Sequence, residues 1–368
     1  MAYYYRLKAL RAAFLRVSLP GRIPAIVLSL SIFAFVASIP AMAASLAGPA
    51  VVTLRFAANV PANSPWDLGL RRLAAEFDRL SRGRVKVVFP PTAHVETESD
   101  IIQKMRLGID GALLTTFGLA ELYPDSFALS MPGFVVDDRE FNAVLTAVAP
   151  LIRSRLGDRY IVLAISKGGW TRYFSKSPIV YPSDLAKLRI SMDPSDEKGI
   201  QLLQSVGARV VTGSTEDFLL QINANEVDAT CVSPIFVATL WSQLRGKIAY
   251  MSSFKVSPFI GAIVFNRSSW EKIPVELRPG LEKAVEGIAE RLDLESAKLE
   301  EEAIDSLDGI QTTSEPADAA SKWADMIAQR RDGLIARMFS PDILDTIDAA
   351  LVKARTGKQA DLQRVGPN

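Results

Sequence analysis

The chain has 368 residues, of which 42 are lysine or arginine, 41 are aspartate or glutamate and 49% are hydrophobic. These proportions are globular and exclude a disordered chain, and a net charge of +1 lacks the basic excess typical of nucleic-acid-binding proteins. The single cysteine, Cys231, excludes an intramolecular disulfide, and the single histidine, His94, leaves little material for a His-dependent triad or a multi-His metal site. We therefore expect no cofactor and no metal. The length favours two domains.

The excess of positive charge lies at the start of the chain. Residues 1–43 contain five basic residues and no acidic one, which leaves 37 basic against 41 acidic residues in the remainder. The basic start precedes an apolar run, Ile23–Ala37, and small residues at Ala41 and Ala43, the order of a secretory signal peptide. The run is shorter than the roughly 20 residues that span a bilayer. We predict cleavage after Ala43 and export to the periplasm, with an uncleaved anchor as the alternative.

Strand and helix patterns alternate after the leader. The first series comprises a strand over 53–60, an amphipathic helix over 64–83, a strand over 84–90, a helix over 98–108 with Ser99 as its N-cap, and a buried strand over 109–116. A polar helix over 137–156 and an apolar strand over 160–166 follow. Such alternation predicts a parallel or mixed sheet with flanking helices.

The same rhythm returns in the second half. It predicts strands over 185–193, 208–212, 227–232 and 257–266, helices over 193–207 and 214–226, and one long helix over 274–306. We expect an α/β fold of two lobes, with mixed sheets, flanking helices, crossing strands and a long C-terminal helix. The expected divisions are 1–43 for the signal peptide, 44–170 mainly for lobe 1, 171–265 mainly for lobe 2, 266–356 for helices across both lobes, and 357–368 for a flexible tail.

No catalytic or nucleotide-binding motif stands in the chain: GxGxxG, GxxxxGK[ST], GxSxG, HExxH and paired CxxC are all missing. Two arginines beside apolar strand residues are the more informative feature. Arg172 lies in GGWTRYFSKSPI and Arg189 in KLRIS. Each is either a structural salt-bridge partner or an anion clamp, since a guanidinium offers two parallel donors to one carboxylate.

Four stretches, GRVKVVFPP, IIQKMRLGIDGALLTT, TRYFSKSPIVYPSDLAKLRI and VGARVVTGSTEDFLLQINANEVDA, resemble the DctP-like solute receptors of TRAP transporters. The resemblance covers about Leu54–Met338. It implies a receptor that is not an enzyme, with ligand held between two lobes and delivered to the TRAP membrane permease. It also implies that Arg189 forms a salt bridge with a ligand carboxylate and that Arg172 assists.

One segment departs from the family pattern. The family commonly has Gly-Gln-Glu-Asn-Pro, whose Asn helps hold the ligand, where this chain has ATCVSP. The amide is missing and the acid-binding pattern is incomplete, so the expected polar contact at this point is the Ser233 hydroxyl. This departure is similar to a divergent branch of the family, some of whose members have an additional periplasmic helical-repeat partner and more apolar ligands. Aromatic residues suited to such a cleft are Trp66, Phe117, Trp170, Phe236 and Trp241, although core packing explains each one separately.

The sequence therefore predicts an extracytoplasmic solute receptor whose ligand is an organic acid. An apolar ligand for the same receptor, a secreted α/β enzyme and a tethered interaction module are the alternatives.

Overall fold

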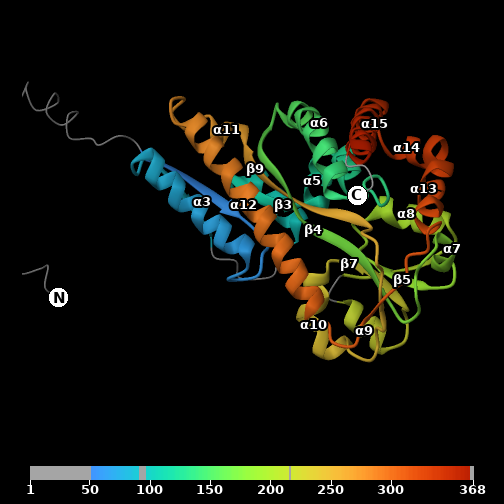
Figure 1. Cartoon of the computed structure of the whole chain (residues 1–368). Coiled ribbons are helices and arrows are strands. Elements are labelled where there is room, and N and C mark those ends of the chain that lie inside the picture. Colours follow the sequence, from blue (N-terminus) through green and yellow to red (C-terminus); the bar gives the residue numbers. More distant parts are fainter. Residues whose placement is uncertain (1–50, 91–96, 215–216, 365–368) are drawn as a thin grey trace, which may run out of the picture. The chain divides into compact units, whose positions relative to one another are not determined.

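The computed structural model describes residues 51–90, 97–214 and 217–364. The predicted signal peptide at 1–43 lies outside these residues. From Val51 onward the chain forms one compact unit, shown in Figure 1. No helix within the described ranges combines the length and the apolar character needed to cross a membrane.

The strands of the sheet come from all parts of this unit. They are β1 (Val52–Ala57), β2 (Val85–Val88), β3 (Gly111–Thr115), β4 (Tyr160–Ser175), β5 (Arg189–Met192), β6 (Arg209–Thr212), β7 (Ala229–Val232), β8 (Tyr250–Met251), β9 (Ser257–Asn266) and β10 (Gln311–Thr312). Their order is β2-β1-β3-β9-β4-β7-β5-β6, with β8 paired to β4 and β10 paired to β8. Parallel pairs flank the antiparallel β3, β9, β4 and β7. The predicted mixed α/β architecture is confirmed.

Helices cover the sheet and connect its strands. They are α3 (Pro65–Ser81), α4 (Glu98–Leu107), α5 (Thr116–Leu122), η1 (Pro124–Ser130), α6 (Asp138–Leu156), α7 (Pro182–Leu185), α8 (Glu197–Ser205), α9 (Asp217–Asn223), α10 (Pro234–Leu244), α11 (Arg267–Trp270), α12 (Arg278–Asp305), α13 (Ala319–Arg330), η2 (Arg331–Ile335), α14 (Ala336–Met338) and α15 (Pro341–Arg364).

Local sequence explains where these helices begin and end. Ser64 caps α3 and the buried face of that helix includes Leu70, Leu73 and Phe77, as the apolar spacing predicts. The predicted N-cap Ser99 is wrong. Thr97 caps α4 instead, because its side chain accepts from Asp100 N while the Asp100 carboxylate accepts from Thr97 N.

The last helix extends into the stretch 357–368 that the sequence predicts to be a flexible tail, and that flexibility stays a prediction. Helix α15 continues through Gly357 to Arg364. One glycine costs a helix only about 1 kcal/mol relative to alanine, and the following Lys-Gln-Ala-Asp-Leu-Gln-Arg run consists largely of good helix formers.

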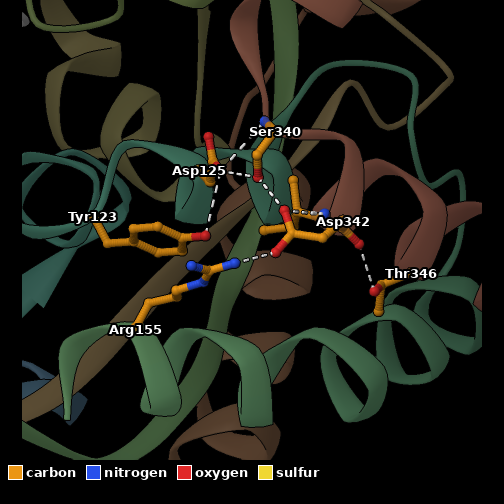
Figure 2. A network of polar contacts seen from close by, with 7 residues as sticks. Tyr123, Asp125, Arg155, Ser340, Asp342 and Thr346 are labelled. Atoms are coloured by element: carbon orange, nitrogen blue, oxygen red, sulfur yellow. Dashed lines mark hydrogen bonds and ion pairs between the residues drawn. The ribbon is translucent and has the colours of Figure 1, made fainter.

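A polar network anchors the start of α15 to the elements that follow β3 (Figure 2). Ser340 Oγ bonds Asp125 in η1, and Asp342 pairs with Arg155 of α6. Tyr123 Oη donates to Asp125 at 3.3 Å, and Thr346 Oγ1 donates to the Asp342 carbonyl at 2.7 Å. The C-terminal helix is therefore held to η1 and α6 by charge-assisted contacts as well as by apolar packing.

Strand β4 joins the two halves of the sheet, one half with β2, β1, β3 and β9 and the other with β7, β5 and β6. Its residues Tyr160–Thr171 pair with β9, and Arg172–Ser175 pair with β7. Helix α12 contacts α3, β4 and α10, so it packs along both halves (Figure 1). The register of β4 shifts between Lys167 and Gly169, where Gly169 has φ +132°. Only glycine adopts this backbone readily.

Replacement of Gly169 should weaken this junction. A Cβ there would lie 2.9 Å from Glu300 Oε2 in addition to forcing the unfavourable φ. We expect Gly169→Ala to lower the free energy of unfolding by about 1–3 kcal/mol in urea denaturation. Gly287→Ala is the control, because that Cβ would meet nothing within 4 Å in α12 and should raise stability slightly. Equal stability of the two variants would contradict the assigned strain.

Candidate ligand-binding site

A cavity of about 1060 Å³ opens where strands of both halves end. Residues at or just beyond the carboxyl ends of β3, β5, β6 and β7 line it, among them Thr116, Asp193, Gly213 and Ser233. Ligands of open α/β sheets bind at the carboxyl ends of strands, where the connecting loops leave a crevice. The topology therefore creates the cavity, and the loops decide its chemistry.

Arg172 lines this cavity from the part of β4 that pairs with β7. Its Nη1 donates to the carbonyls of Ser252 and Ser253 at 2.9 and 2.5 Å, while its buried Nε has no hydrogen-bond partner. Within the described ranges it forms no salt bridge. Burial lowers the pKa of the guanidinium, while the charges of Glu300 and Glu315 act in the opposite direction. A half-buried cation with an unused donor is suited to hold an anion.

Arg189 does not line the cavity. Its Nε and Nη2 donate to both oxygens of Asp228 at 2.9 and 2.7 Å, and its Nη1 donates to the Asn225 carbonyl at 2.6 Å. The hydrogen bonds from Arg189 lower the pKa of Asp228 to about 2. Because Arg189 is the first residue of β5, it lies at the opposite end of that strand from the cavity. Ser191 and Met192 occupy the cavity end. The geometry is that of a structural ion pair.

Trp170 lies in the core and is only 2% exposed. Its indole N–H donates to Asp138 Oδ1 at 2.9 Å, and the ammonium groups of Lys167 and Lys255 lie 5.6 and 4.8 Å from its ring centroid. Although burial acts against it, hydrogen bonds from Lys167 and Trp170 lower the pKa of Asp138 to about 2. Trp170 thus supports the junction of β4 and does not line the cavity, and neither does Trp241, which packs in a second core cluster.

Four other predicted residues do line the cavity: Trp66, Phe117, Ser233 and Phe236. Trp66 and Phe117 come from the first turns of α3 and α5, and Phe236 comes from the first turn of α10. The Ser233 Oγ accepts from Ile235 N at 3.2 Å as the N-cap of α10. The cavity therefore receives aromatic side chains from both halves of the unit.

Sequence reasoning missed an aromatic cluster in the cavity wall. Trp323 of α13 lies with its ring centroid 4.7 Å from that of Phe254 and 6.2 Å from that of Tyr173, and all three residues line the cavity. Trp323 comes from a helix far along the chain, and its indole N–H donates to the Val180 carbonyl at 2.9 Å. No local pattern marks such a residue, since only tertiary packing brings α13 to this wall.

A buried acid and the single thiol were also missed. Asp196, the N-cap of α8, lines the cavity and accepts from Gly199 N at 2.8 Å. Burial, together with the charge of Asp193, raises the pKa of Asp196 to about 7 against the effects of Gly199 N–H and Lys198. Cys231 lines the cavity as well, and burial raises the pKa of its thiol to about 12, so it is a poor nucleophile.

Metal binding has no support in the described part of the chain, where no group of three His, Cys, Asp or Glu side chains could hold an ion.

Comparison with known proteins identifies the family. The model of bacterial extracellular solute-binding proteins, family 7 (DctP), matches residues 56–337. The chain belongs to this family. The predicted resemblance is confirmed, and the cavity at the strand ends is the candidate solute site of this DctP member.

Individual relatives are distant in sequence but similar in fold. The C4-dicarboxylate-binding periplasmic protein DctP of Rhodobacter capsulatus is 21% identical over 334 residues, which cover 86% of this chain and 96% of that protein. A TRAP periplasmic solute-binding protein from Ochrobactrum anthropi matches with a TM-score of 0.73 at 18% identity over 84% of this chain and 97% of that one. One from Sulfurospirillum deleyianum, with bound succinate, matches with a TM-score of 0.69 at 17% identity over 82% and 99%.

The shifted pKa of Asp196 makes stability depend on pH. Because its carboxyl has a pKa of about 7 in the fold and near 3.8 otherwise, the folded chain binds the proton more tightly, and its contribution to stability falls as pH rises between these values. We expect Asp196→Asn, which keeps an N-cap side chain, to raise the melting temperature relative to the unmodified protein more at pH 8 than at pH 5. Differential scanning calorimetry at both pH values measures this, and a constant difference would contradict the burial of a titrating carboxyl.

Proposed function

We propose that this chain is an extracytoplasmic receptor that captures a small organic acid in the cavity and delivers it to the membrane permease of a TRAP transporter. Arg172 carries the proposal, because it is a half-buried, cavity-lining cation with an unsatisfied Nε and without a protein carboxylate in contact among the described residues. A ligand carboxylate would satisfy its charge and its free donors at once, as a charge-assisted, shielded hydrogen bond of about 1.5–3 kcal/mol. The relatives described as binding succinate and C4-dicarboxylates support an acid as ligand.

The remaining site residues follow from this arrangement. We propose that Trp66 and Phe117 contact the ligand from one half of the unit, and that Ser233 and Phe236 contact it from the other. A ligand held by both halves binds a closed arrangement better than an open one, so it shifts the population toward closure. The closed form would be the one that docks on the permease. A periplasmic helical-repeat partner stays a prediction.

The absence of catalytic motifs in the sequence supports a receptor that releases its solute unchanged. Arg189, the first anchor expected from the sequence, is replaced in this proposal by Arg172, because the donors of Arg189 are engaged by Asp228 and the Asn225 carbonyl.

Isothermal titration of arginine variants tests the anchor. With a carboxylate ligand that binds the unmodified protein, Arg172→Gln should weaken affinity at least tenfold, since a buried charge pair is lost. Arg189→Gln is the matched control and should leave affinity unchanged while lowering the free energy of unfolding slightly through loss of the Asp228 pair, which is partly screened by solvent. The opposite ranking of the two variants in affinity would return the anchor to Arg189.

Export is the second part of the proposal. Removal of residues 1–43 by signal peptidase would leave a mature chain that begins at Ala44. Intact-mass analysis of the protein from its native periplasm should show this N-terminus. A mature protein that keeps Met1 would instead favour a membrane-anchored form.

A further inference from the structure

The hydroxyl groups of the cavity wall are largely bonded within the protein. Thr116 Oγ1 pairs with Ser130 Oγ at 2.9 Å, and Thr171 Oγ1 pairs with Ser257 Oγ at 2.8 Å. Ser191 Oγ donates to Gln221 Oε1 at 2.6 Å. The wall therefore offers few free hydroxyls to a ligand, although all of these residues except Gln221 line it.

Two further hydroxyls of the wall also take part in hydrogen bonds within the protein, one as donor and one as acceptor. Thr230 Oγ1 donates to the Ser191 carbonyl at 3.3 Å, and Ser233 Oγ accepts from Ile235 N at 3.2 Å. Only two cavity-lining residues in the described ranges have a buried side-chain polar atom without a partner: the Nε of Arg172 and the Oγ of Ser253. They are neighbours, since Arg172 Nη1 donates to the Ser253 carbonyl. Unsatisfied polarity in the described wall is thus concentrated around Arg172.

The other cavity-lining charges are also engaged or solvated. Lys255 pairs with Asp138, and Arg355 pairs with Glu140. Asp193 accepts from Ser195 N, and Asp196 accepts from Gly199 N. Glu315 is exposed to solvent. A second carboxylate on a ligand would find no uncommitted lysine or arginine in the described wall apart from Arg172, and it would face these acids.

The rest of the wall is apolar and large. Aromatic side chains contribute much of it, including Trp66, Phe117, Phe236, Phe254, Phe259 and Trp323. The volume of about 1060 Å³ reaches the upper end of the roughly 300–1,000 Å³ that hold drug-sized ligands. A four-carbon acid would leave most of this apolar surface in contact with water.

We infer that the ligand of this receptor is a monocarboxylate with a bulky apolar body, whose carboxylate binds Arg172 and whose body packs on the aromatic wall. The inference rests on the proposed receptor function and defines its ligand class. A sugar acid would bury several hydroxyls against a wall with few free donors and acceptors, which costs affinity for every group left unpaired. An apolar body would gain about fourfold in affinity for each methylene removed from water.

A chain-length series tests this class. Calorimetric titration of the dialysed protein with butyrate, hexanoate, octanoate and decanoate should give affinities that rise about 15-fold with each pair of methylene groups. Succinate and galacturonate should bind at least tenfold more weakly than octanoate. A flat or falling series, or tightest binding by succinate or galacturonate, overturns the inference.

Two variants test whether the aromatic wall causes the dependence of affinity on chain length. Phe236→Gln should weaken octanoate binding about tenfold and butyrate binding much less, because it removes apolar wall and leaves Arg172 in place. Phe89→Gln, a partly exposed aromatic outside the cavity, should change neither affinity. Thermal unfolding of each variant separates loss of contact from loss of fold, and an unchanged chain-length dependence in a folded Phe236→Gln protein contradicts the assigned wall.

The same titrations distinguish failure of this inference from failure of the proposed function. Tight, Arg172-dependent binding of succinate would preserve the receptor for organic acids and overturn only the apolar class. Absence of binding by every carboxylate in the panel would overturn both.

Discussion

The change of partner along β4 is the constraint on which the rest of the structure depends. One strand of 16 residues pairs with β9 up to Thr171 and with β7 from Arg172 onward. The same strand therefore joins the two halves of the sheet at the point where the cavity opens. Arg172 is the first residue after the change, and its guanidinium donates to the carbonyls of Ser252 and Ser253. A bulge with glycine at positive φ lies just before this point.

Two arginines with similar sequence surroundings thus have different physical roles. Arg189 satisfies its charge with Asp228 at the start of β5, which is the usual state of a partly buried guanidinium. Arg172 is more deeply buried and bears an unsatisfied Nε, a cost that a fold retains where a ligand offsets it. The distinguishing feature is which end of a strand each residue occupies, since the crevice of an α/β sheet forms at the carboxyl ends.

The selectivity proposed for the cavity arises from what its polar groups already bind. Hydroxyls that already bond within the protein have fewer donors and acceptors left for the hydroxyls of a sugar acid, and acids next to the wall disfavour a second carboxylate. The aromatic wall then makes burial of an apolar body the main source of affinity. A single fold can hold polar and apolar acids in different relatives because its strands position the cavity while loop and helix residues decide its chemistry.

The sequence by itself determined the alternation of strands and helices, the α/β class, the family and several cavity residues, including Arg172, Ser233 and Phe236. These depend on local periodicity, caps and short motifs, which the chain carries without reference to distant residues. Only the tertiary structure decided that Arg189 pairs with Asp228, that Trp170 is buried by Asp138 and two lysines, and that Trp323 from α13 joins the cavity wall. Each of these outcomes depends on contacts between segments far apart in the chain, which no local pattern encodes.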